Sequence, residues 1–293
     1  MSEFWDVCSG GWQETLQGLH LNLKDTYSDD EEEAASAGDD YELPVDDIAI
    51  AYSAWNKSDP FDCGMTCALA FGGAENARDM ANNARMYNRA SESNGALMRC
   101  APLACIAWAN NLSVEKTAAI ARQDAQLSHP SSVCQDANAA FCVALAHLLR
   151  RPQDHTGAVA AARSVVEDAC VASWLELSRV LAPSAAAADF SVYARDCCQN
   201  VGHVKHAFVL AFSLLRARPL PSYQLAVASV LKLGGDTDTN ACICGYLMGA
   251  LHGFRVGSGI PSRMRDAVLK FDCTSVRHTP SMLLGTARPQ TYR

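Results

Sequence analysis

The chain has 293 residues, 49% of them hydrophobic, so it can bury a sizeable core as one large domain or two small ones. A formal net charge of −8 argues against a surface that binds nucleic acid. The 13 cysteines form no paired C-x₂-C framework, which indicates reduced thiols in a cytoplasmic protein. The first residues lack a basic n-region and a long apolar core, so no signal peptide is expected, and the longest apolar run, residues 207–212, is too short to span a membrane.

The first 43 residues differ in composition from the rest of the chain. Residues 28–43, SDDEEEAASAGDDYEL, are acidic and polar, as is typical of a solvated or disordered linker. We therefore expect residues 1–43 to be an atypical, partly disordered acidic segment. Residues 44–272 are then expected to form a helical domain, followed by a C-terminal tail over residues 273–293.

Helical periodicity begins after Pro44 and recurs to near the end of the chain. In the first expected helix, which Pro60 ends, the apolar positions are Val45, Ile48, Ala49, Tyr52 and Trp55. A second helix is expected soon after Asp62, and a third contains Met98, Leu103 and Ile106. Further helices are expected over residues 113–127, 138–150, 157–182, 201–215 and 261–271. Because no run of alternating strand residues accompanies them, the fold is expected to be all-α.

Residues 233–253, LGGDTDTNACICGYLMGALHG, combine a glycine turn, oxygen ligands and a helix of small residues. Gly245, Gly249 and Gly253 lie four apart on one helical face, at a cost of roughly 1 kcal/mol each relative to alanine. We therefore expect this face to pack very closely against a neighbouring helix.

The start of this helix carries three oxygen ligands, Asp236, Asp238 and Thr239. Carboxylate and hydroxyl oxygens suit Mg²⁺, Mn²⁺ or Ca²⁺ rather than zinc. Spacing alone leaves a second interpretation open, in which Asp236 is a plain N-cap and the helix dipole favours Asp238.

GGDTDT followed by a small-residue helix resembles the C-terminal metal motif of the ADP-ribosylglycohydrolase family. Residues 93–108, SNGALMRCAPLACIAW, are similar to a second signature in which a G-N-G-type turn leads into A-x-M-R-x-x-P-L. Residues 201–215 resemble the helix that precedes the last metal motif. The resemblance covers about residues 45–270 and implies a compact globule of orthogonal α-helices.

The resemblance also implies which residues lie at the substrate. They are Asn94, Gly95, Ala96, His129, Gly202 and His203. Ser93 stands where the family signature begins with glycine. His129 precedes a proline, and such a histidine is otherwise a turn residue. Asp62 resembles a D-x-G-x-T helix start of the family or is a plain N-cap, and Arg99 is either an anion contact or a structural ion pair.

Two Mg²⁺ ions, or Mn²⁺, are implied as cofactors, held by two motifs far apart in sequence. Asp236, Asp238 and Thr239 would supply one motif, with Asp238 bridging both ions. The best match to the family's [ST]-D-D-T motif is Ser28, Asp29 and Asp30, which continues with Glu31 rather than threonine. Asp238 and Asp29 are the expected catalytic residues. The G-x-x-x-G-D-A-x-G helix that opens family members has no match in this chain.

The implied reaction is Mg²⁺-dependent hydrolysis of the glycosidic bond between ADP-ribose and a protein side chain or small acceptor. The partner would be an ADP-ribosylated protein or an ADP-ribose-containing small molecule, with no nucleic acid and no membrane. The alternative is a catalytically impaired relative that binds ADP-ribose or acts as a scaffold. The state of Ser28–Asp30 distinguishes the two.

Overall fold

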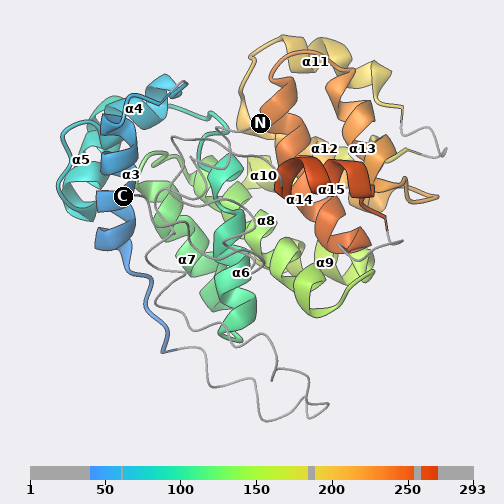
Figure 1. Cartoon of the computed structure of the whole chain (residues 1–293), viewed down its shortest axis with the longest axis horizontal. Coiled ribbons are helices and arrows are strands. Elements are labelled where there is room, and N and C mark those ends of the chain that lie inside the picture. Colours follow the sequence, from blue (N-terminus) through green and yellow to red (C-terminus); the bar gives the residue numbers. More distant parts are fainter. Residues whose placement is uncertain (1–39, 61, 184–188, 254–258, 270–293) are drawn as a thin grey trace.

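A computed structural model describes residues 40–60, 62–183, 189–253 and 259–269 of the chain (Figure 1). Within these ranges the chain forms thirteen α-helices, two short 3-10 helices and no strand, which confirms the all-α fold. The first seven elements are α3 (Val45–Lys57), α4 (Met65–Phe71), α5 (Ala77–Tyr87), η1 (Leu97–Arg99), α6 (Ala101–Ala109), α7 (Val114–Gln126) and α8 (Ser132–Arg150). The remaining eight are α9 (His155–Ser164), α10 (Ala169–Val180), η2 (Ser191–Tyr193), α11 (Ala194–Cys198), α12 (Val204–Arg216), α13 (Tyr223–Leu231), α14 (Thr237–His252) and α15 (Ser262–Leu269).

Helix α8 forms the centre of the molecule, with α6 and α7 packed on one side and α9 on the other (Figure 1). Fourteen of its 19 residues are buried. Its many alanines let neighbouring helices approach closely, and its buried faces supply much of the apolar core. Length and composition would let α8 cross a membrane, yet 78% of its apolar window is buried inside the protein. Helix α8 is therefore a buried core helix of this structure.

Helices α3, α4 and α5 pack together at one side of this core (Figure 1). The rings of Tyr52 and Phe71 stack with centroids 5.0 Å apart, which joins α3 to α4. Asn88, after α5, donates to the carbonyls of Thr66 and Ser128 over 2.7 and 3.0 Å. That side chain therefore ties this group of helices to the end of α7.

Helices α12, α13 and α14 pack together on the other side (Figure 1). The glycine face of α14 lies against one aromatic side chain, Tyr223 of α13. A Cβ atom added to Gly245 would lie 3.2 Å from the Tyr223 hydroxyl, and one added to Gly249 would lie 3.8 Å from its ring. The third glycine, Gly253, ends the helix with a φ of 75°, which glycine adopts readily. Close packing against α13 is therefore seen at Gly245 and Gly249, whereas Gly253 is the C-cap of the helix.

One helix expected over residues 157–182 is in fact two, α9 and α10, and the prediction of a single helix was wrong. The break is caused by Asp136 of α8, whose carboxylate accepts the amides of Glu167 and Asp168 over 2.8 Å each. The same carboxylate pairs with Arg122 of α7 at 2.6 Å. Asp136 therefore joins α7 and α8 to the start of α10.

Other boundaries also differ from the prediction. Helix α8 begins at Ser132 rather than 138, whereas α3 ends at Lys57, just before Pro60, as expected. Helix α4 begins at Met65 with Gly64 at its N-cap position, so Asp62 is not the cap. A 3-10 turn precedes α6 because Pro102, which lacks an amide hydrogen, suits the first turn of a new helix. Helices α5, α11 and α13 were not predicted.

Candidate active site

A tight glycine turn presents the acidic start of α14. Gly234 and Gly235 have φ values of 78° and 72°, which disfavour any residue with a side chain. Both pack against the end of α11, where a Cβ on Gly234 would lie 3.0 Å from the Cys198 sulfur and one on Gly235 would overlap the Cys197 carbonyl. The turn is therefore held in place by its close contact with α11.

Asp236 occupies the N-cap position of α14, but its side chain makes no capping hydrogen bond. Instead, Oδ2 of Asp236 accepts a hydrogen bond from Nδ2 of Asn94 over 2.7 Å. Asp238 and Thr239 follow in the first turn, where Asp238 is exposed. The three side chains offer hard oxygen atoms at one helix end, a donor set of the kind that Mg²⁺ takes.

Asn94 lies in a loop that runs beside the start of α12. Its amide donates to the Gly202 carbonyl over 2.8 Å, and the Val204 amide donates to the Glu92 carbonyl over 2.9 Å. These bonds flank an isolated antiparallel bridge between Ser93 and His203. A Cβ on Gly202 would lie 3.7 Å from Oδ2 of Asp236. The structure thus brings Asn94, Gly202, His203 and Asp236 together from three parts of the chain.

Gly95 and Ala96 face the protein interior rather than open space. A Cβ on Gly95 would lie 3.0 Å from the Cys67 sulfur and 3.1 Å from Cε1 of His129. Ala96 is fully buried. Glycine at position 95 is therefore explained by internal packing, and a ligand could reach these residues only through their backbone.

His129 is completely buried beneath this loop, with 0% of its surface exposed. Its Nε2 is 2.7 Å from the Ser93 hydroxyl, and its Nδ1 is 2.7 Å from the Ser128 hydroxyl. Burial, together with the positive charge of Arg99, lowers the pKa of His129 to about 3. The ring is thus neutral at physiological pH, and the structure places it behind the loop.

Arg99 holds the loop from the same side. Its guanidinium, 1% exposed, pairs with Asp124 at 3.2 Å and donates to the Gly95 carbonyl over 3.1 Å. It also lies 5.0 Å from the centroid of the Tyr52 ring, whose hydroxyl donates to Asp124 over 2.9 Å. Burial and the Asp124 carboxylate raise the pKa of Tyr52 well above its usual value. Of the two roles open for Arg99, the structure shows the structural ion pair.

Asp124 and Tyr52 were not predicted from the sequence as partners in this network. Asp124 lies on the buried face of α7, near the fully or almost fully buried Ile120 and Ala121. An acidic residue on the apolar face of an amphipathic helix could have indicated a buried partner. Tyr52 was assigned to the core, and nothing in its spacing predicted the role of its hydroxyl.

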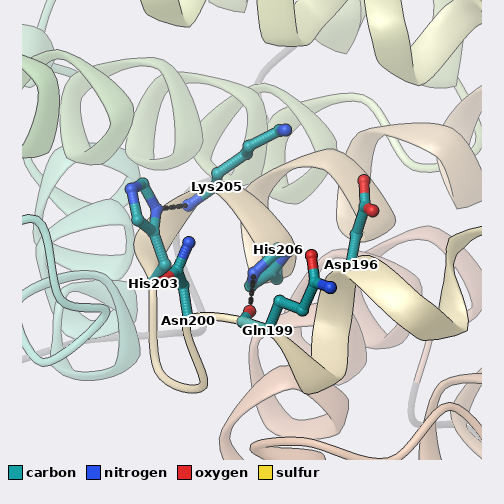
Figure 2. Close-up of a pocket in the computed structure, with 6 residues that line it drawn as sticks. All are labelled: Asp196, Gln199, Asn200, His203, Lys205 and His206. Carbon is teal, nitrogen blue, oxygen red and sulfur yellow. Dashed lines mark hydrogen bonds between the residues drawn. The ribbon is translucent and has the colours of Figure 1, made fainter.

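His203 borders a polar cavity of about 290 Å³ lined by Asp196, Gln199, Asn200, His203, Lys205 and His206 (Figure 2). Its Nδ1 accepts from the Lys205 amide over 3.1 Å and so caps α12, while its Nε2 is 3.1 Å from Glu92. His206 donates from Nε2 to the Gln199 carbonyl over 3.2 Å, and its Nδ1 lies 3.2 Å from the Tyr193 hydroxyl. Both rings therefore use both nitrogens within the protein.

The second expected metal motif, Ser28, Asp29 and Asp30, lies outside the described residues. Among the residues that the structure does describe, no group of three or more His, Cys, Asp or Glu side chains converges. Asp236 and Asp238 supply only two carboxylates, to which Thr239 adds a hydroxyl. A complete dinuclear site would therefore need ligands from elsewhere in the chain.

Comparison with known proteins identifies the family of this chain. The family model for ADP-ribosylglycohydrolase matches residues 13–290. A protein of Acanthamoeba polyphaga mimivirus, provisionally named ADP-ribosyl glycohydrolase L543, is 31% identical over 236 residues, which cover 78% of this chain and 68% of the viral protein. By the extent of both matches, the chain belongs to the ADP-ribosylglycohydrolase family.

Proposed function

We propose that this member of the family is a Mg²⁺-dependent hydrolase that cleaves the glycosidic bond between ADP-ribose and a protein side chain or small acceptor. The observation that carries this proposal is the contact of Asn94 with Asp236. It joins the loop expected beside ADP-ribose to the helix start expected to bind metal. Both motifs are thereby within reach of one ligand.

The donor atoms of the α14 helix start fit a hard cation. The Asp236 carboxylate does not cap α14, and among the described residues Asn94 engages only its Oδ2, so Oδ1 is available to an ion. Asp238 and Thr239 are within the same first turn. Ser28, Asp29 and Asp30 fall inside the stretch matched by the family model, which supports their assignment as the second set of ligands.

Bound Mg²⁺ would supply Lewis-acid activation of a water and orientation of the ribose hydroxyls. The other roles in the proposed reaction belong to residues of the chain itself. Asn94 orients Asp236, Asp236 and Asp238 would hold the cation, and Asp29 would accept a proton from water. The Arg99 bond to the Gly95 carbonyl fixes the loop along which the substrate would lie.

The second candidate function is binding of ADP-ribose without turnover. It is favoured by one specific departure, Glu31, which stands where the family motif has threonine. Loss of that hydroxyl would weaken the second ion site while leaving the Asn94 loop and the α14 motif intact.

Calorimetric titration of ADP-ribose in Mg²⁺ and then in EDTA, followed by hydrolysis assays on peptides ADP-ribosylated at arginine or serine, separates the candidates. The hydrolase requires Mg²⁺-dependent binding and turnover, whereas the binding protein shows the first without the second. Asp238→Asn should abolish turnover and keep the fold. The matched control is Asp47→Asn, another exposed first-turn carboxylate, on α3. Unchanged turnover in Asp238→Asn would contradict the proposed metal site.

A further inference from the structure

The imidazole of His129 bridges two hydroxyl groups beneath the loop that carries Asn94. One is Ser128, its chain neighbour, and the other is Ser93, 36 residues away in sequence. A neutral imidazole has one N–H donor and one acceptor nitrogen. Two partners at 2.7 Å each therefore satisfy the ring completely.

Ser93 in turn continues this polar chain toward α4. The Ser93 hydroxyl donates to the Thr66 hydroxyl over 3.4 Å. The Thr66 hydroxyl in turn lies 2.9 Å from the Ser91 hydroxyl. In either tautomer the ring uses one nitrogen on the Ser93 hydroxyl and the other on the Ser128 hydroxyl.

The neighbours of Ser93 are the residues that bring the candidate site together. Asn94 donates to Asp236 through its side chain and to Gly202 through its amide. The Gly95 carbonyl is held by Arg99. Three consecutive residues are thus each fixed by a different partner, and His129 is the partner of the first.

We propose that Ser93 and His129 are positioning residues, which fix the loop so that Asn94 reaches Asp236, and that His129 does not contact the substrate. A ring that is fully buried and uses both nitrogens has neither surface nor donor to offer a ligand. Glycine at position 93, as in the family signature, would have no hydroxyl for this bond. The serine is therefore the feature that assigns His129 a supporting role in this chain.

The test uses the whole protein and three variants. Ser93→Ala removes the hydroxyl that binds His129, and Ser93→Thr keeps one. Ser91→Ala is the matched control, because it removes a hydroxyl from the same loop that bonds Thr66 and not His129. Two readouts are compared, hydrogen exchange of the Asn94 amide, which bonds the Gly202 carbonyl, and calorimetric affinity for ADP-ribose in Mg²⁺.

In Ser93→Ala we expect the Asn94 amide to exchange about five- to tenfold faster and ADP-ribose to bind more weakly by a similar factor, as loss of one buried hydrogen bond predicts. Ser93→Thr should restore both, and Ser91→Ala should change neither. Wild-type exchange in Ser93→Ala would overturn the inference. The affinity readout rests on the proposed function; if the wild-type protein binds no ADP-ribose, that function fails, and the exchange comparison alone decides the role of Ser93.

Discussion

The side chain of Asn94 donates a hydrogen bond to Oδ2 of Asp236 over 2.7 Å, across 142 residues of sequence. Asn94 is itself 6% exposed, so the bond forms largely away from water. Hydrogen bonds to a charged group contribute about 1.5–3 kcal/mol, more than those between neutral groups. This contact therefore orients one carboxylate of the candidate metal site.

Replacing Asn94 by alanine should weaken Mg²⁺-dependent binding of ADP-ribose. Loss of a charge-assisted bond of the size given above corresponds to about 10- to 100-fold in affinity. Calorimetry with and without Mg²⁺ measures the change. Asn82→Ala, on the exposed face of α5, is the control. Equal affinities in the wild type and Asn94→Ala would show that the contact does not help to form the site.

Arg99 and Asp124 form a buried ion pair whose partners depend on each other. Arg99→Met should lower the free energy of unfolding by about 3–5 kcal/mol, because it leaves the Asp124 carboxylate buried without its cation. The double variant Arg99→Met/Asp124→Leu should recover part of that loss, since it removes the stranded charge. Denaturant unfolding of the variants provides the measurement. A double variant less stable than Arg99→Met alone would show that the pair is not the source of the cost.

Sequence alone predicted the fold class and the motifs at the candidate site, because both depend on local patterns. The periodicity after Pro44 and the GGDTDT string each lie within a short window of residues. Contacts between distant segments could not be predicted in this way. The bond from Asn94 to Asp236 joins the loop before α6 to the start of α14, and the break between α9 and α10 depends on Asp136 of α8. Both appear only when segments distant in sequence are packed together.

His129 illustrates a second limit. The order of motifs predicted a residue beside the substrate, and the structure places its ring against Gly95. The ring lies on the buried side of the loop, where it is hydrogen-bonded to the hydroxyls of Ser93 and Ser128. Sequence spacing contains no information about this burial or these hydrogen bonds, so the orientation of the ring could not be predicted.

The glycine turn before Asp236 should tolerate no side chain at its second position. Gly235→Ala places a Cβ into the Cys197 carbonyl and forces alanine to a φ of 72°. We expect a loss of at least about 2 kcal/mol in unfolding free energy, from backbone strain together with steric overlap. Gly64→Ala is the matched control, because a Cβ there meets no atom within 4 Å and φ is −56°. Similar stabilities for the two variants would contradict this account of the turn.

The buried neutral ring of His129 should make the protein less stable as pH falls. The pKa of His129 is about 3 in the folded protein, whereas its ordinary value, expected in the unfolded chain, is 6.5. Between these values the unfolded chain binds a proton that the folded one excludes, so stability from this group is complete above pH 6.5 and declines below it. From pH 7.5 to pH 5 the loss is about 2 kcal/mol.

The contribution of His129 can be separated from that of other groups by comparing wild type with His129→Gln. Glutamine can bond both serines but does not titrate. The unfolding free energies of the two proteins, measured by denaturant at pH 7.5 and pH 5, should therefore differ in their pH dependence by about 2 kcal/mol, with the wild type losing more. Parallel pH profiles would show that the folded protein accommodates a charged ring at position 129, which complete burial between two hydroxyls does not allow.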